Sequence, residues 1–297
     1  MLNIGFRAHD YGQFSSVEEM GRTIESYYPQ SIIQLALKKV VPSSRPWQEW
    51  DEEYISSVTD TLQKHGVKTV VVGCYINPIH PDEEKRKEEV KRFIKGLELN
   101  RAFGCRVVAT ETGTVNPKGG YSIHTSDPKN LEIFYASLSE MVNAAEKYDA
   151  YCTIEAVNHT HTMTSVERMA AMIEKFPSSH LKVLFDPVNL IPYAGIKEAD
   201  GSEREFPTPE AQRAFYAPIL DLYGERLVAI HCKDFRLSEE GAKIWNLPAL
   251  TGVFDWQGFM TEIKKRHMEN IPWSLENMNP ETVKDTVSKL QAMWEKA

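Results

Sequence analysis

The sequence predicts an α/β fold, a (β/α)8 barrel in which residues 1–297 form a single domain. Eight short apolar or β-branched runs recur along the chain, and stretches with helical spacing separate them. Strands that alternate with helices form parallel βα units, and eight such units close into a TIM barrel. The alternative is a doubly wound sheet, but no GxGxxG motif follows the first run. No linker or low-complexity segment divides the chain.

The first predicted strand, residues 2–6, is an alternating apolar run at the start of the chain. It lacks the basic flank, long apolar core and cleavage site of a signal peptide, so we expect a cytoplasmic protein. The other strands are predicted at residues 31–37, 67–73, 105–110, 150–156, 181–186, 227–232 and 271–276. Helical stretches between them occupy residues 18–28, 53–66, 86–104, 131–148 and 165–176.

Charge and composition exclude several classes of partner. The formal net charge is −8, and no tract is rich in Lys or Arg. A protein that binds the nucleic-acid backbone needs a basic face, so no nucleic-acid partner is expected. No stretch approaches the roughly 20 apolar residues of a membrane span, so no membrane partner is expected. Cys74, Cys105, Cys152 and Cys232 stand singly in or beside apolar runs, and we expect buried thiols.

The connections between predicted elements are asymmetric. Those that enter strands are brief, whereas those that leave strands are long: residues 38–53, 75–85, 111–130, 158–165, 187–210 and 233–256. In parallel barrels the active site is built from the loops at the carboxyl ends of the strands. Functional residues are therefore expected at those ends.

Four polar residues stand at or near the ends of successive predicted strands: Glu155, Asp186, His231 and Glu276. A carboxylate is costly to bury unless it is paired or bound to a metal. Three crowded carboxylates repel one another, and a divalent cation removes that repulsion. An oxygen-rich set with one imidazole suits Mn, Co, Mg or Zn, and four protein ligands leave coordination positions open for substrate.

The competing interpretation is that these residues are isolated and form salt bridges with Arg7, Lys233 or Arg236. One such strand-end residue is usually structural, but four on consecutive strands favour one metal site.

The segments TIEAVN, FDPVN, HCKDF and SLEN, which contain these residues, closely resemble those of the xylose-isomerase-like TIM barrels. The resemblance extends over most of the chain, including ATETGTVNP at residues 109–117 and GVFDW at residues 252–256. That superfamily includes sugar-phosphate isomerases and epimerases, ketose 3-epimerases, inosose dehydratases and apurinic endonucleases. The resemblance implies one divalent metal ion held by Glu155, Asp186, His231 and Glu276. It also implies that Glu155 and Glu276 are the catalytic acid/base pair.

This chemistry suits isomerisation or epimerisation of a small sugar or sugar derivative. A metal that binds the carbonyl and a neighbouring hydroxyl oxygen stabilises the enediolate. One glutamate then removes the proton and the other returns one. Return to the same carbon gives an epimer and return to the adjacent carbon gives an isomer; the sequence leaves the sugar and the outcome open. Oligomeric state is open as well, since dimers and tetramers occur among similar barrels.

Further residues are expected near the substrate. Residues two apart on a strand point the same way, so Lys233 faces the same side as His231 and can bind a substrate oxygen. The other residues expected to contact the substrate are His9, Gln34, Glu111, Asn189 and Arg236. His159 and His161 either orient Glu155 or lie on the surface. The loop aromatic residues Trp47, Tyr75, Trp245 and Trp256 either line the pocket or pack in the core.

Three other functions compete with this one. A dehydratase of an inosose-like cyclitol would use the same metal and base but expel a hydroxyl group. An apurinic endonuclease is disfavoured by the acidic charge, by Asn189 where many relatives carry histidine, and by KDFR at residues 233–236 in place of a DxH pair. A non-catalytic sugar-binding barrel is expected to lack one of the two glutamates, and this chain has both.

Overall fold

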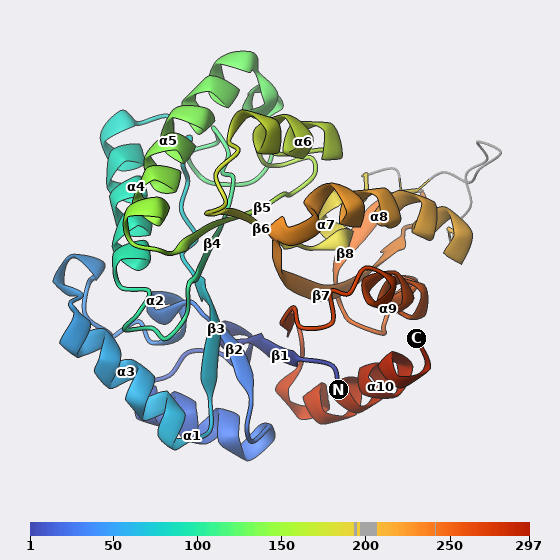
Figure 1. The fold of residues 1–297 in the computed structure, drawn as a ribbon, viewed down its shortest axis with the longest axis horizontal. Helices are drawn as coiled ribbons and strands as arrows, with labels where there is room; N and C mark the ends of the chain where they lie inside the picture. Colours follow the sequence, from blue (N-terminus) through green and yellow to red (C-terminus); the bar gives the residue numbers. More distant parts are fainter. Residues whose placement is uncertain (193–194, 197–206, 241) are drawn as a thin grey trace.

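The computed structural model describes residues 1–192, 195–196, 207–240 and 242–297. Eight parallel strands form a closed sheet in the order β6-β5-β4-β3-β2-β1-β9-β7, and pairing between β6 and β7 completes the ring. Helices lie around the outside of these strands (Figure 1). The predicted (β/α)8 TIM barrel is confirmed.

Each of the eight predicted runs overlaps a barrel strand. The strands are β1 Ile4–Arg7, β2 Ile32–Leu35, β3 Lys68–Gly73, β4 Val107–Glu111, β5 Tyr151–Glu155, β6 Leu181–Phe185, β7 Leu227–Leu237 and β9 Trp273–Leu275. The five predicted helices are α1 Val17–Tyr27, α3 Glu52–Lys64, α4 Glu83–Glu98, α5 Pro128–Lys147 and α6 Val166–Lys175. The remaining helices are α2 Leu37–Val40, α7 Pro187–Leu190, α8 Pro209–Tyr223, α9 Trp256–Lys265 and α10 Val283–Lys296. Short 3-10 helices occur at Ala8–Tyr11, Trp47–Glu49, Ile123–Ser126, Gly224–Arg226 and Pro280–Thr282.

Local sequence explains where several helices begin. The side chains of Ser16, Asp51, Asp82 and Ser165 each accept a hydrogen bond from a backbone N–H in the first turn of the following helix. Such caps satisfy donors that have no partner within the helix. Because the caps follow the long loops, they hold the first turns of these helices at the same end of the barrel as the carboxyl ends of the strands.

The seventh strand differs from its prediction. It was expected to end at residue 232, with a loop over residues 233–256; instead β7 continues to Leu237 and pairs antiparallel with β8, Lys243–Pro248. The loop prediction is wrong here because the charged Lys233 and Asp234 interrupt the apolar run, yet both are buried within the strand. The predicted loop at residues 187–210 begins with α7, and residues 193–194 and 197–206 of it lie outside the described residues.

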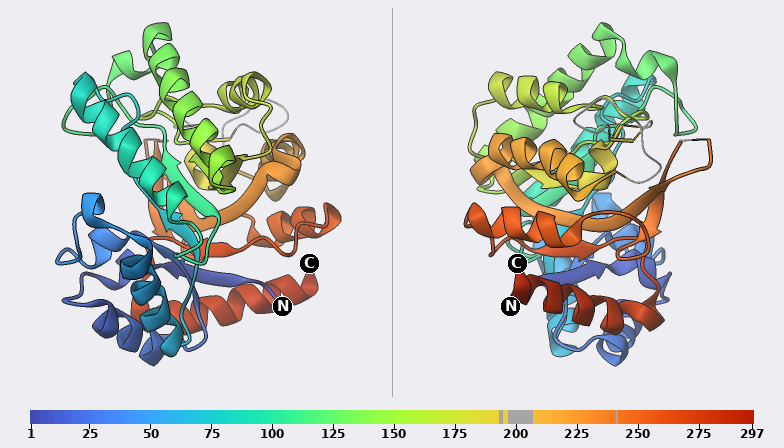
Figure 2. Two further views of the ribbon diagram at one scale, coloured as in Figure 1. Left: turned by 60° about the vertical axis from the view of Figure 1, so that its left-hand side comes forward. Right: turned by 90° about the vertical axis from the view of Figure 1, so that its right-hand side faces the viewer.

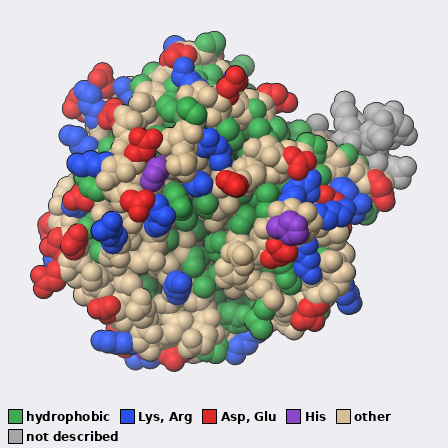
Figure 3. All heavy atoms as spheres, viewed as in Figure 1, with side chains coloured by type: hydrophobic (Ala, Val, Ile, Leu, Met, Phe, Trp, Pro, Cys, Tyr) green, Lys and Arg blue, Asp and Glu red, His purple; other side chains and the backbone are tan. Residues whose placement is uncertain are grey.

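The core fills the barrel and the layer between strands and helices. All four cysteines are buried and free, as predicted. The N- and C-termini lie on the same side of the molecule (Figure 2), and the Leu2 backbone N–H donates to the Gln291 side chain at 2.9 Å. Acidic and basic side chains are interspersed over the face drawn in Figure 3. Within the described part of the chain, no helix has the length and apolar character needed to cross a membrane.

Candidate metal centre

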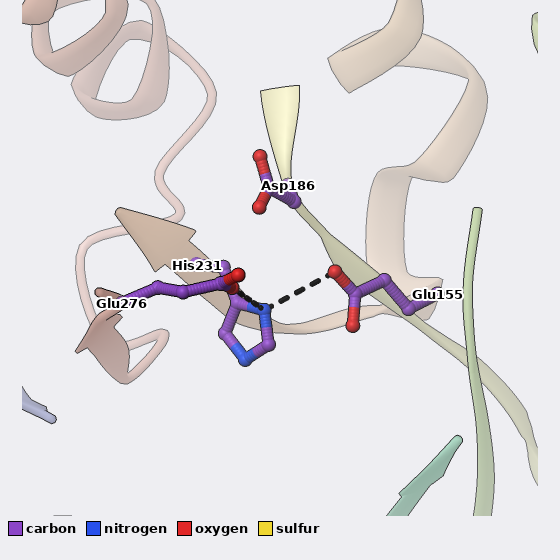
Figure 4. A group of neighbouring side chains, drawn as sticks. All are labelled: Glu155, Asp186, His231 and Glu276. Atoms are coloured by element: carbon purple, nitrogen blue, oxygen red, sulfur yellow. Dashed lines mark hydrogen bonds and ion pairs between the residues drawn. The ribbon is translucent and has the colours of Figure 1, made fainter. Parts of the chain in front are cut away.

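The four predicted ligands converge at one end of the barrel (Figure 4). Glu155 is the last residue of β5, Asp186 follows β6, His231 lies within β7, and Glu276 follows β9. These strands are consecutive neighbours around the ring, which is why residues far apart in sequence meet. One ligand atom from each residue lies within 4.8 Å of the others, and all four side chains are buried.

The His231 ring is oriented by partners on both sides. Its Nδ1 lies 2.9 Å from Glu276 Oε2 and 3.2 Å from Glu155 Oε1. Its Nε2 lies 2.6 Å from Gln34 Oε1, and the Gln34 amide donates to the Tyr75 hydroxyl at 2.6 Å. Nε2 therefore donates its proton to Gln34, and Nδ1 faces the two carboxylates. A metal-binding histidine has this arrangement, because a hydrogen bond from the outer nitrogen fixes the tautomer and leaves the inner nitrogen for the metal.

Two basic side chains also reach the cluster. Lys233 Nζ lies 2.9 Å from Asp186 Oδ2 and 3.0 Å from Glu276 Oε1. The Arg7 guanidinium lies 2.9 Å from Glu276 Oε1. The salt bridges expected under the competing interpretation thus form with Arg7 and Lys233, but within the cluster rather than at isolated residues.

The charges around the carboxylates give them different pKa values. Burial acts to raise the pKa of Glu276, but Lys233, His231 and Arg7 together hold it well below its usual range. Burial raises the pKa of Asp186, and the attraction of Lys233 only partly opposes this effect. Burial acts to lower the pKa of His231, but Glu155 and Glu276 raise it to about 10. Glu276 is consequently a carboxylate at neutral pH. The negative charge of the cluster would stabilise a bound cation.

These donors fit a divalent cation. Among the described residues, the buried Asp186 Oδ2 has no hydrogen-bond partner and lies 2.9 Å from the Lys233 ammonium group. The backbone N–H of Asn189 donates to Asp186 Oδ1 at 3.0 Å, and its side-chain amide donates to Glu155 Oε1 at 2.7 Å. Asn189 therefore orients two of the four ligands. Three carboxylates and one imidazole form a set suited to Mn, Co, Zn or Mg.

The residues expected to contact the substrate take different positions. Gln34, Asn189 and Lys233 are buried and contact the four ligands directly. Glu111 ends β4 in register with Glu155, and burial and the nearby Glu276 raise its pKa. Arg236 is exposed on the outer part of β7. No hydrogen bond or ion pair between it and the cluster is seen among the described residues.

His9 lies beside the cluster. Its ring packs edge-on against Tyr75, with centroids 5.8 Å apart, and its buried Nδ1 has no hydrogen-bond partner within the part of the chain that the structure describes. Burial and the neighbouring Arg7 and Lys39 lower its pKa to about 3, so His9 is neutral at physiological pH. The substrate-binding roles of all these residues remain predictions.

Among the aromatic candidates, Tyr75 belongs to the site through Gln34, whereas Trp256 is buried in the core. His161 is not a surface residue: its Nδ1 accepts from the Gly113 backbone N–H, and its Nε2 lies 3.5 Å from Glu111 Oε2.

Sequence reasoning gave two residues of this region too little weight. Arg7 was expected at the barrel mouth beside His9 and as a salt-bridge partner, but it is not among the predicted site residues; it is the last residue of β1. Lys39, which was not selected, places its ammonium group 3.6 Å from the centre of the Tyr75 ring.

The comparisons with known proteins agree with the fold. The structure resembles a D-tagatose 3-epimerase-like protein, with a TM-score of 0.71 and 15% identity, over 100% of this chain and 99% of that chain. It resembles the 3-keto-D-glucoside 4-epimerase YcjR from E. coli, with a TM-score of 0.69 and 13% identity, over 98% and 100%. It also resembles the IOLI protein, solved with a binding zinc atom, with a TM-score of 0.66 and 14% identity, over 99% of each chain.

Among proteins with curated descriptions, none matches the sequence. The family model of the xylose isomerase-like TIM barrel matches residues 33–295. The match spans most of the 297 residues, and the chain therefore belongs to the xylose isomerase-like TIM barrel family.

Proposed function

We propose that this protein is a divalent-metal-dependent isomerase or epimerase of a small sugar or sugar derivative. The observation that carries the proposal is the convergence of two buried carboxylates, Glu155 and Glu276, on the inward-facing Nδ1 of His231, with Asp186 in the same cluster, in which one ligand atom of each residue lies within 4.8 Å of the others. Support comes from the solved structures with this fold, two of which are named as sugar epimerases or as epimerase-like. The zinc atom of the IOLI protein supports the metal assignment.

The residues that would hold the metal are Glu155, Asp186, His231 and Glu276. When bound, a divalent ion polarises a sugar carbonyl and stabilises the negative charge that develops as the neighbouring C–H loses its proton. The protein supplies the acid and the base. Glu155 and Glu276 approach the same His231 nitrogen from β5 and from the end of β9, so a substrate bound at that point lies between them.

Each glutamate is prepared for its role by a neighbour. The Arg7 and Lys233 cations keep Glu276 ionised, so that it is able to accept a proton from the substrate carbon. The Asn189 amide fixes one oxygen of Glu155, which orients that carboxyl group. General acid/base transfer by a positioned carboxyl group contributes about 10²–10⁴-fold to the rate. Lys233 is proposed to contact the substrate oxygen as well, because its ammonium group already lies between Asp186 and Glu276.

The first experiment is elemental analysis of untagged protein beside the His231→Ala variant. We expect about one equivalent of Mn, Co, Zn or Mg in the wild type and its loss in the variant. Absence of metal even after loading would refute metal dependence and leave the ion-pair network of Lys233 and Arg7 as the only role of the cluster.

The second experiment tests the reaction class. Keto and aldo sugars are incubated with the protein in D2O, and NMR detects exchange of the proton beside the carbonyl together with formation of an isomer or epimer. Glu276→Gln is the matched control, since it keeps the side-chain volume and removes the base. A product that absorbs as an enone or dione would assign the dehydratase reaction instead.

A further inference from the structure

A second groove opens beside the metal centre, between the loops that follow β4 and β5. It encloses about 350 Å³ and is lined by Tyr121, Ser122, Asn158, His159 and Ser165, among others. That volume lies at the lower end of the range for small-molecule sites, about 300–1,000 Å³. Because both loops leave the carboxyl ends of their strands, the groove lies at the same end of the barrel as the four ligands.

The groove is linked to the metal centre through shared wall residues and hydrogen bonds. Asn158 and His159 also line a narrow cavity whose other walls include Asn189 and Trp245. Asn189 in turn donates to Glu155 Oε1 at 2.7 Å, and the Asn158 backbone N–H donates to the Asn189 carbonyl at 3.0 Å. Asn158 and His159 therefore connect the wall of the groove to a residue that orients a catalytic glutamate.

The floor of the groove is an aromatic stack. The rings of Tyr121 and His159 lie nearly parallel, with centroids 4.2 Å apart. Tyr121 remains 51% exposed and Ile123 71% exposed, and these are two of the four large apolar side chains exposed among the described residues. Exposed apolar surface gathered at a concave site is typical of a binding surface.

The backbone of His159, in the stack, is held in an unfavourable conformation. His159 has a φ of 72°, in the left-handed region that non-glycine residues rarely adopt. Gly119 and Gly120, with φ values of 79° and 81°, lead the chain into Tyr121. Backbone strain of this kind persists at ligand-binding sites because the surrounding structure enforces it.

We propose that the groove binds the second ring of a disaccharide-sized substrate. The proposal rests on the proposed function, which places the keto sugar unit at the metal centre. An exposed aromatic ring offers a flat apolar surface to the C–H face of a sugar. Ser122 and Ser165 line the same groove; each hydroxyl oxygen accepts a backbone N–H, which leaves the O–H of Ser122 as a donor for a sugar oxygen. A free monosaccharide bound at the four ligands would leave this surface uncovered.

Calorimetric binding of sugar alcohols tests this assignment without requiring turnover. D-glucitol is compared with its glucosylated forms maltitol (4-O-linked) and isomaltitol (6-O-linked); they carry no carbonyl and cannot be epimerised. We expect at least one disaccharide alcohol to bind about tenfold more tightly than D-glucitol, the contribution of a well-placed aromatic contact. Tyr121→Ala should remove that advantage without changing D-glucitol binding, whereas Tyr121→Phe should keep it.

Tyr27→Ala is the matched control, because it removes another exposed tyrosine ring, at the end of α1 and outside the groove. If neither disaccharide alcohol binds better than D-glucitol, or if Tyr121→Ala keeps the preference, the assignment is overturned. A change of oligomeric state in Tyr121→Ala without a change in preference would make the groove a contact between copies instead. The proposed function is tested separately by the D2O experiment. Absence of proton exchange with any sugar would refute it, whichever sugar alcohol binds more tightly.

Discussion

Gln34 should control metal affinity although it is not a ligand. Its Oε1 accepts the hydrogen bond from His231 Nε2 at 2.6 Å, and both side chains are 1% exposed. Replacement by Leu keeps a similar volume but removes the acceptor, so the imidazole is no longer held in the tautomer that points Nδ1 at the carboxylates. Loss of such a partner typically lowers metal affinity 10–100-fold, about 1.4–2.7 kcal/mol.

The assay is metal binding by competition with a chelator, measured for the wild type, Gln34→Leu and Gln34→Glu. The glutamate variant is the matched control, because its carboxylate still accepts from Nε2 and makes the imidazole a stronger ligand. We expect it to bind metal at least as well as the wild type. Gln34→Leu should also lower the free energy of unfolding of the metal-free protein by about 1–3 kcal/mol, since a buried donor loses its partner. Equal metal affinity in Gln34→Leu and the wild type would refute the argument that Gln34 fixes the ring.

Three further outcomes are expected. Glu276→Gln should lower kcat about 10²–10⁴-fold, as measured by proton exchange, while circular dichroism stays unchanged; retained activity would remove Glu276 as the base. Lys233→Met should lower the free energy of unfolding by about 3–5 kcal/mol in denaturant titrations of the metal-free protein, because Asp186 loses its buried ammonium partner and Glu276 keeps only Arg7 and His231 among the described residues. A decrease in the free energy of unfolding of less than 1 kcal/mol would mean that water solvates the carboxylates, or that they become protonated, when the ammonium group is removed. Burial lowers the pKa of Lys243 to about 7, so above pH 7 the native state binds fewer protons here than the unfolded state. Stability of the wild type relative to Lys243→Met should therefore rise between about pH 7 and pH 10, and a flat difference would show that Lys243 stays charged.

The barrel and the convergence of the four candidate ligands were predictable because both depend on features with a local signature. Apolar runs of strand length recur eight times, and each ligand stands at or near the end of such a run, as Asp186 does after the apolar residues of β6. The carboxyl ends of the strands meet at one end of a parallel barrel. A residue at the end of an apolar run is therefore predicted to lie at that end of the barrel. The contact between Gln34 and His231 has no such signature, because it joins residues 197 positions apart. The stacking of Tyr121 on His159 likewise depends on two loop conformations that residue type does not specify.

The end of the seventh strand shows how a functional requirement obscures a structural signal. Lys233 and Asp234 are adjacent charged residues, which indicated that the strand had ended, yet both are buried. Lys233 contacts Asp186 and Glu276. Asp234 instead accepts hydrogen bonds from the backbone N–H groups of Phe235, Leu250 and Phe254. The charge of Lys233 is paired within the cluster of candidate ligands, and the charge of Asp234 holds the loop between β8 and α9, so the strand is able to continue past both. The apolar pattern does not predict the end of the strand here, because the cost of burying the two charges is offset by partners that only the folded chain brings together.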